Sequence, residues 1–241
     1  TACTGSMAWR GWRTTATLLY TLTCDASDLQ PEVRRRQFVA PVVTTAFRPI
    51  PGLAFRAMAR RHQRMPTFNE LHYHEMGNIL LRPERCWQGS VGGEWERHFF
   101  RRTSTIALSA DAFIHRITDK IVALPRGSGQ WRWMMLNVGE VVARGVELKG
   151  RAAWHPRTGV DFEVNAHYSY NRAEDRSNPD DNDPDFGTFK GQIPYLPRHA
   201  GGLSAQCTLS PITLLYVWSG PGSRYRSSAN TPSNRLSPWQ T

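Results

Sequence analysis

Apolar and polar residues alternate strictly in one long stretch of the chain, from Val160 to Asn171. The apolar set is Val160, Phe162, Val164, Ala166, Tyr168 and Tyr170. The positions between them are polar or charged, as in a β-strand with two different faces, whereas an α-helix would mix the two sets. The pattern therefore predicts a strand about as long as one that crosses a membrane.

A second alternating stretch precedes the first and runs from Val146 to His155. Its apolar set is Val146, Leu148, Gly150, Ala152 and Trp154. The segment HPRTG at residues 155–159 separates the two stretches and supplies Pro and Gly where a tight turn needs them. The two stretches are predicted to form one long hairpin.

Weaker alternation recurs along the rest of the chain and extends the same prediction to an all-β fold. The further candidate strands are residues 8–20, 39–48, 53–60, 91–99, 106–114, 203–209 and 212–218. Counted with the hairpin, these stretches predict about nine antiparallel strands, most of them with one apolar and one polar face.

Short and long connections between these strands alternate. Short turns lie near residues 49–52, 98–102, 155–159 and 210–211, and long polar segments lie at 21–38, 63–85, 119–141, 173–198 and from 220 onward. Soluble sandwiches rarely need so many long loops. A transmembrane β-barrel has short periplasmic turns and long extracellular loops, so the pattern favours a sector of such a barrel. A soluble all-β binding module with a basic surface is the alternative.

Composition narrows the class further. The chain has 241 residues, of which 40% are hydrophobic and 21% charged, with a mean hydropathy of −0.49. No stretch approaches the roughly 18–20 consecutive apolar residues of a spanning helix, which excludes a helical membrane protein. Strands hide their lipid contacts in every second residue, so low hydropathy is compatible with a barrel.

The net charge of +10 arises from 30 Lys and Arg against 20 Asp and Glu. Basic groups fall near both ends of the strands, which argues against a single nucleic-acid-binding face. Near the long loops they are suited to the phosphates of lipopolysaccharide and other outer-membrane lipids, or to an anionic ligand. The long-loop clusters are Arg34 to Arg36 and Arg60, Arg61 and Arg64; the short-turn cluster is Arg97, Arg101 and Arg102.

No motif points to an enzyme or to structural zinc. The sequence has no nucleophile elbow, P-loop or dinucleotide fingerprint, and its eight histidines lack metalloenzyme spacing. The four cysteines are scattered without a Cys-x-x-Cys pair, and whether any of them pair depends on which strands are neighbours. They are Cys3, Cys24, Cys86 and Cys207.

Three segments resemble TonB-dependent outer-membrane receptors. The first is RMPTFNEL at residues 64–71 with GNILLRPE at 77–84, similar to the paired loop boxes of that family, although Ile79 replaces the usual Pro. The second is NVGE at 137–140 with RGVEL at 144–148, and the third is GQIPYLPRH at 191–199. Their order and spacing span most of the chain.

The resemblance implies a partial barrel domain over residues 1–241, an internal piece without the plug domain or the C-terminal closing strand. For full-length relatives it implies a receptor in the outer membrane of a Gram-negative bacterium. Such receptors take up scarce, bulky nutrients such as ferric siderophores, haem or cobalamin, driven by the TonB energy-transducing complex. No enzymatic step and no cofactor are expected, and the piece alone is expected not to transport.

Two groups of residues are candidate binding sites. His72 and His74 lie between the loop boxes, where haem-transporting relatives place an axial histidine, and Glu70 or Glu75 is suited to orient such an imidazole. We group Arg64 with them as a candidate ligand contact. Two solvated loop histidines are the simpler interpretation of the pair.

An acidic loop is the candidate calcium site. Asp181, Asp183 and Asp185 repeat at every second position and offer several oxygen ligands for Ca²⁺. Pro184 interrupts the repeat, and Gln192 stands where an EF-hand has its bidentate Glu. A solvated acidic loop is therefore the alternative.

Overall fold

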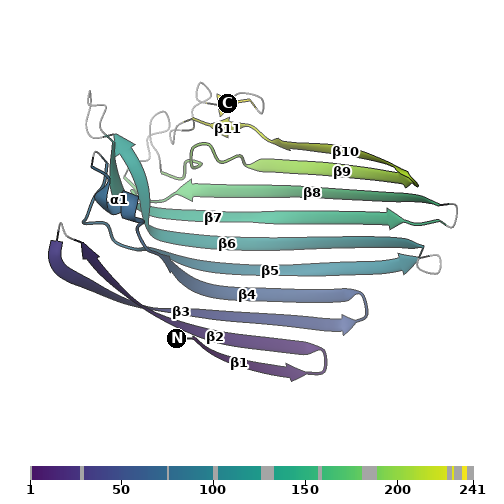
Figure 1. Cartoon of the computed structure of the whole chain (residues 1–241), viewed down its shortest axis with the longest axis horizontal. Helices are drawn as coiled ribbons and strands as arrows, with labels where there is room; N and C mark the ends of the chain where they lie inside the picture. Colours follow the sequence, from purple (N-terminus) through teal and green to yellow (C-terminus); the bar gives the residue numbers. More distant parts are fainter. Residues whose placement is uncertain are drawn as a thin grey trace.

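The computed structural model shows one curved antiparallel sheet of ten strands, in which each strand pairs with the next along the chain (Figure 1). It describes residues 2–27, 30–74, 76–99, 103–125, 133–156, 159–180, 189–226, 230 and 235–237. The strands are β1 (Ala2–Trp9), β2 (Trp12–Ser27), β3 (Gln30–Ile50), β4 (Leu53–Arg64), β5 (Glu84–Phe99), β6 (Ser104–Pro125), β7 (Trp133–Trp154), β8 (Val160–Asp175), β9 (His199–Leu209) and β10 (Ile212–Pro221). The predicted all-β, antiparallel fold is confirmed.

The predicted strand over residues 8–20 is wrong. That region is a hairpin of β1 and β2, with Trp9 paired to Trp12 across the turn Arg10-Gly11. Both turn residues have positive φ, 39° and 84°, as a two-residue hairpin turn of the favoured type requires. Arg is an unusual residue for the first position of such a turn, which is why the sequence pattern missed it. The sheet therefore has ten strands rather than about nine.

Several predicted long loops are shorter than expected because the strands continue into them. β2 and β3 reach Ser27 and Gln30, and β6 and β7 reach Pro125 and Trp133. Backbone pairing persists in these extensions although the apolar alternation has ended. The five short connections that follow β1, β3, β5, β7 and β9 lie together at one end of the sheet, hereafter the turn end (Figure 1). The opposite end, which carries the longer connections, is the loop end.

The predicted hairpin of β7 and β8 is confirmed, and its register places both apolar sets on one face. Leu148 lies opposite Tyr168, and Trp154 lies opposite Phe162. The same face continues through the neighbouring strands. Leu108 of β6 lies opposite Gly150 of β7, and Leu203 of β9 lies opposite Ala166 of β8. We call it the apolar face and the opposite one the polar face.

Large apolar side chains on the apolar face are exposed, as expected for a wall that meets lipid rather than a packed core. Leu148 is 43% exposed and Leu108 is 52% exposed. Aromatic rings line the turn end of this face: Trp12 stacks on Phe47 at 4.3 Å, and Trp154 stacks on Phe162 at 5.7 Å between ring centroids. Such rings are typical of the interfacial girdle of a membrane barrel.

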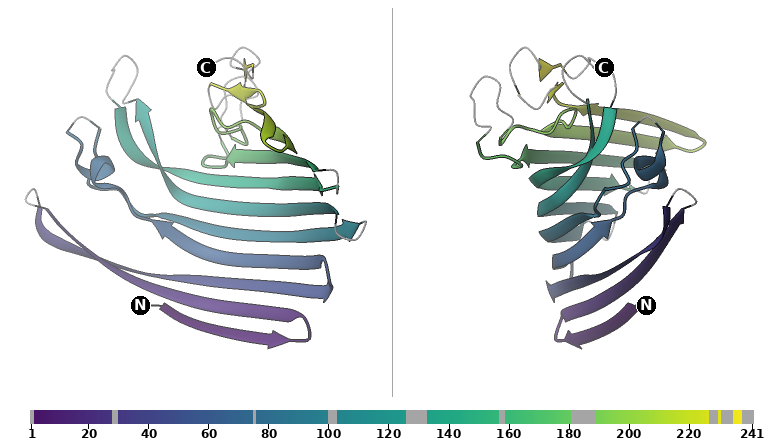
Figure 2. Two further views of the ribbon diagram at one scale, coloured as in Figure 1. Left: turned by 45° about the vertical axis from the view of Figure 1, so that its right-hand side comes forward. Right: turned by 90° about the vertical axis from the view of Figure 1, so that its left-hand side faces the viewer.

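Buried side chains gather at the loop end instead. Val141, Ala143 and Ala173 form a small cluster that Ile193 and Leu196 cover. A helix, α1 (Phe68–His72), and a two-stranded sheet of β11 (Arg224–Tyr225) and β12 (Arg235–Leu236) also lie there. Within the described ranges, no helix is long and apolar enough to cross a membrane. Figure 2 shows the curvature of the wall, with α1 at the loop end.

Candidate functional site at the loop end

The connection between β4 and β5 begins with a short helix whose start the sequence encodes. Thr67 is the N-cap of α1, and its hydroxyl accepts a hydrogen bond from the Glu70 N–H at 3.3 Å. The Glu70 carboxylate in turn accepts one from the Thr67 N–H at 2.8 Å. This reciprocal pair is a capping box, which satisfies two backbone donors at the helix start. The segment PTFNEL is thus a local folding signal.

Arg64 holds the two ends of this connection together. Its guanidinium lies 3.0 Å from a carboxylate oxygen of Glu70 and 2.7 Å from one of Glu84. Glu84 also accepts a hydrogen bond from the Ile121 N–H of β6 at 2.8 Å. Partial burial would raise the pKa of Glu70, but the hydrogen bonds from Arg64 and Thr67 outweigh it and hold the pKa below its usual value.

A turn at Gly77 and Asn78 closes the connection onto β7. A Cβ atom on Gly77 would lie 2.6 Å from the Tyr73 backbone nitrogen, so only glycine fits there. The Asn78 side chain accepts from the Leu80 N–H and donates to the Met135 carbonyl, both at 2.9 Å. The turn is ordered by these bonds although Ile79 replaces the proline of the resembling motif.

Asn137 joins the first and second sequence motifs in space. Its amide oxygen accepts from the Arg82 N–H at 2.7 Å, and its amide nitrogen donates to the carbonyls of Arg82 at 2.8 Å and Asp119 at 2.7 Å. Asp119 has a positive φ of 56° and pairs with Arg82 and Arg85 at 2.7 and 2.6 Å. One amide therefore fixes the connection after α1 to the β6–β7 hairpin.

The third motif, residues 191–199, packs on the loop end of β8 through Gln192. This residue is almost fully buried, at 1% exposure. It accepts from the Ala173 N–H at 3.2 Å and donates to the Leu196 carbonyl at 3.3 Å. Its backbone N–H and carbonyl bond the Asn230 side chain at 2.5 and 2.9 Å. The three motifs thus form one continuous structure along the loop end, which we call the rim.

Comparison with known proteins identifies the family. A model described as the β-barrel of TonB-dependent receptor-like proteins matches residues 12–241. The chain belongs to the TonB-dependent receptor β-barrel family. A sequence comparison with curated proteins found no significant match. The family predicted from the sequence is confirmed.

Solved structures share the fold of this TonB-dependent receptor barrel at low sequence identity. The FrpB iron transporter of Neisseria meningitidis (F3-3 variant) is 16% identical with a TM-score of 0.60, covering 92% of this chain and 32% of its own. The copper transporter OprC is 14% identical with a TM-score of 0.67, with coverages of 93% and 34%. BauA, the ferric preacinetobactin receptor of Acinetobacter baumannii, is 13% identical with a TM-score of 0.66, with coverages of 98% and 33%. The chain thus spans about a third of the length of these proteins.

The polar face of the receptor wall carries charged pairs that bridge strands. Arg56 on β4 reaches across β5 to Asp111 on β6, with its Nε 2.8 Å from Asp111 Oδ1. The bridge passes over Gly92, where a Cβ would lie 2.0 Å from that oxygen. Arg151 and Glu163 pair at 3.0 Å on β7 and β8. Charges so placed suit a hydrated lumen.

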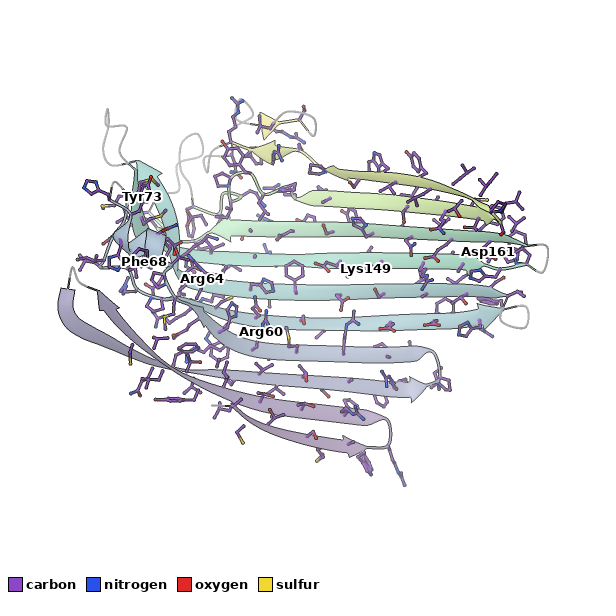
Figure 3. All side chains as sticks on the ribbon, in the orientation of Figure 1. Arg60, Arg64, Phe68, Tyr73, Lys149 and Asp161 are labelled. Carbon is purple, nitrogen blue, oxygen red and sulfur yellow. The ribbon has the colours of Figure 1, made fainter. Side chains whose placement is uncertain are left out.

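The predicted ligand residues lie around α1, at the loop end in Figure 3, which labels Arg64, Phe68 and Tyr73 there and Asp161 at the turn end. His72 is partly buried, its ring centroid is 4.8 Å from that of Phe68, and its Nδ1 has no hydrogen-bond partner within the described part of the chain. His74 is exposed. The Glu70 carboxylate accepts hydrogen bonds from Arg64 and from the Thr67 N–H.

Several other predictions on sites stay predictions. Glu75 and the proposed calcium ligands Asp181, Asp183 and Asp185 lie outside the described residues, as do the side chains of Arg34 to Arg36. Among the residues that are described, no group of three or more His, Cys, Asp or Glu side chains could hold a metal ion. The four cysteines are free and unpaired, each on a different strand.

Sequence reasoning missed the residues that build the rim. Asn137 and Gln192 were part of recognised segments, but nothing in their local pattern showed which backbone groups they would bind. Asp119 carried no signal because its partners Arg82 and Arg85 are more than thirty residues away in the chain, and Glu174 carried none because its burial depends on the packing of the loop end. Glu174, 2% exposed, is paired with Arg172 and Arg176 at 2.5 and 3.0 Å.

Proposed function

We propose that this chain forms part of the wall and the ligand-gathering rim of an outer-membrane receptor that imports a bulky metal chelate of the ferric siderophore type. The observation that carries the proposal is the two-faced wall with an ordered rim at one end. An apolar face suits lipid, a charged face suits a hydrated passage, and a fixed rim above that passage suits ligand capture.

The ligand class is supported by the proteins that share the fold. Their names describe an iron transporter, a copper transporter and a ferric siderophore receptor. Haem and cobalamin, which the family resemblance also allowed, have no counterpart among these names. Transport would require the TonB energy-transducing complex, since nothing in the wall itself supplies energy.

Within the rim we propose His72 and His74 as contacts for the ligand. His72 has a buried ring nitrogen without a hydrogen-bond partner among the described residues, and His74 is open to solvent. Arg64 is bound by two carboxylates, so its contribution is to hold α1 and the ligand contacts beside it in position.

Uptake of radiolabelled iron tests the function. The gene region that encodes this chain, with its flanking sequence, is expressed in a Gram-negative host deprived of its own siderophore receptors. Uptake of ferric siderophores that stops when the TonB complex is deleted would support the proposal. Absence of uptake for every ferric siderophore offered, with the protein correctly inserted, would refute it.

The histidine contacts need a separate comparison. In the same host, the double variant His72→Ala/His74→Ala is expected to weaken binding of the chelate by roughly tenfold, the value of one to two lost polar contacts. His98→Ala at the turn end is the matched control and should bind normally. Equal affinity of the double variant and the control would remove both histidines from the site.

A further inference from the structure

Arginines cluster on the apolar face where that face approaches the loop end. Arg61 on β4 and Arg116 on β6 both lie opposite Trp87 of β5, which stands between them. Arg144 on β7 lies opposite Arg172 on β8, one step nearer the turn end. Because side chains alternate along each strand, these four arginines share the face of Leu148 and Tyr168. We call them the arginine belt.

The belt lies at the boundary of the apolar band. The neighbouring same-face residues toward the turn end are apolar or aromatic, such as Ile114 before Arg116 and Tyr170 before Arg172. Those toward the loop end are polar, such as Thr118 and Glu174. On β6 the same-face residues are apolar from Ile106 to Ile114, a span of nine residues, within the roughly 9–11 that a tilted strand needs to cross the hydrocarbon core. The belt is therefore at the level of the outer-leaflet head groups.

Carboxylates neutralise the belt only in part. Glu140 pairs with Arg116 at 2.7 Å, and the buried Glu174 is shared by Arg144, Arg172 and Arg176. Arg61 has no carboxylate within the described residues and lies over the Trp87 ring at 5.7 Å. The guanidiniums stay accessible, with side-chain exposures of 62% for Arg116 and 50% for Arg144. This surface thus keeps a net positive charge that faces the membrane interface.

A shallow apolar hollow of about 500 Å³ lies on the turn-end side of Arg61, Trp87 and Arg116. Ala59, Gly89 and Ile114 form the next row of the same face and line it. The depression forms because Ala59 has only a methyl group and Gly89 has no side chain, and Val91 and Val43 border it. A charged belt above an apolar hollow matches one kind of molecule, an amphiphile with an anionic head group.

We propose that the arginine belt and this hollow bind a phosphorylated glycolipid of the outer leaflet, of the lipid A type. Guanidinium groups bind phosphate through paired, charge-assisted hydrogen bonds, so Arg61 and Arg116 would hold one phosphate and Arg144 and Arg172 a second. One acyl chain fills the hollow. The site is on the apolar face of the wall, opposite the charged face that carries Arg56 and Asp111. It rests on the outer-membrane location in the proposed function but not on the imported ligand.

Lipid binding to the receptor purified from outer membranes in detergent tests the site, with native mass spectrometry as the readout. The probes are bisphosphorylated lipid A, the same lipid without phosphates, and inorganic phosphate. The unmodified protein should prefer the bisphosphorylated lipid to its dephosphorylated form by about tenfold or more, since each interfacial arginine contributes about 1 kcal/mol. Arg61→Gln/Arg116→Gln should lose most of that preference.

Arg151→Gln is the matched control, because Arg151 is also paired with a carboxylate but lies on the polar face. It should bind lipid A normally.

If the double variant fails to insert, Arg61→Gln alone serves, since Arg61 carries no ion pair within the described part of the chain. Its preference for the bisphosphorylated lipid is expected to fall about threefold to fivefold. Equal binding of both lipids, inorganic phosphate competing at the lipid's own affinity, or an unaffected variant would each overturn the site. Iron uptake can fail while lipid binding persists, so the two proposals are separable.

Discussion

The turn half of the wall and its rim are held together in different ways. In the turn half, regular antiparallel ladders satisfy the backbone, and side chains only need to be apolar on one face and polar on the other. At the rim, side chains such as Asn137 and Gln192 satisfy the backbone of irregular segments. The wall therefore tolerates the exchange of one apolar residue for another or one polar residue for another, whereas the rim depends on individual amides and carboxylates.

A charge on the apolar face should give the largest effect. Leu148→Arg places a guanidinium near the middle of the apolar band, at a cost of about 2–4 kcal/mol. We expect a severe loss of heat-modifiable, membrane-inserted protein. Ser169→Arg is the control, because Ser169 lies opposite Glu147 on the polar face of the same hairpin. If both variants insert equally well, the assignment of the two faces is wrong.

Removal of the amide of Asn137 should have the next largest effect. Asn137→Ala leaves the Arg82 N–H and two carbonyls without this partner, at a cost of about 1–3 kcal/mol that is confined to the rim. Limited proteolysis should cut the connection after α1 faster, while the membrane-inserted yield stays normal. Asn165→Ala, which removes a polar-face amide bound to Glu163, should leave proteolysis unchanged.

Glycine substitutions on β5 should separate the faces within the turn half. Gly92→Ala puts a Cβ in contact with Asp111 and displaces the Arg56 bridge, with an expected loss of about 1 kcal/mol. Gly89→Ala, whose Cβ would lie 3.6 Å from Ile114 on the apolar face, should be close to neutral. Thermal loss of heat-modifiable mobility measures both, and an equal shift in the two variants would contradict the bridge.

Acidification should loosen the rim slightly and leave the wall intact. The pKa of Glu70 is below its usual value, so its ion pair contributes stability above the unfolded-state pKa of about 4.3. That contribution, under about 1 kcal/mol, is lost as the pH falls through the lower, folded-state pKa. Hydrogen exchange at α1 should therefore quicken only below about pH 4. Glu70→Gln should exchange faster at neutral pH and lack this acid dependence.

The alternation of apolar and polar residues predicted most strands of the wall. The β7–β8 hairpin and its two faces were predicted because each residue's environment depends on its own position along the strand. The β1–β2 turn was missed because Arg10 adopts a positive φ that its residue type does not announce. The strand extensions beyond the apolar band were missed because alternation ends there: residues 34–36 are three successive arginines, and residues 121–125 read IVALP.

Residues close together in the chain encode the two-faced strands, the capping box of α1 and the motifs that identify the family. The tertiary structure alone decided that Asn137 binds Arg82, that Arg56 crosses Gly92 to Asp111, and that Arg61, Arg116, Arg144 and Arg172 form one belt. These relations join different strands, so they depend on register. Register is set cooperatively by the whole sheet, and no single segment of sequence contains it.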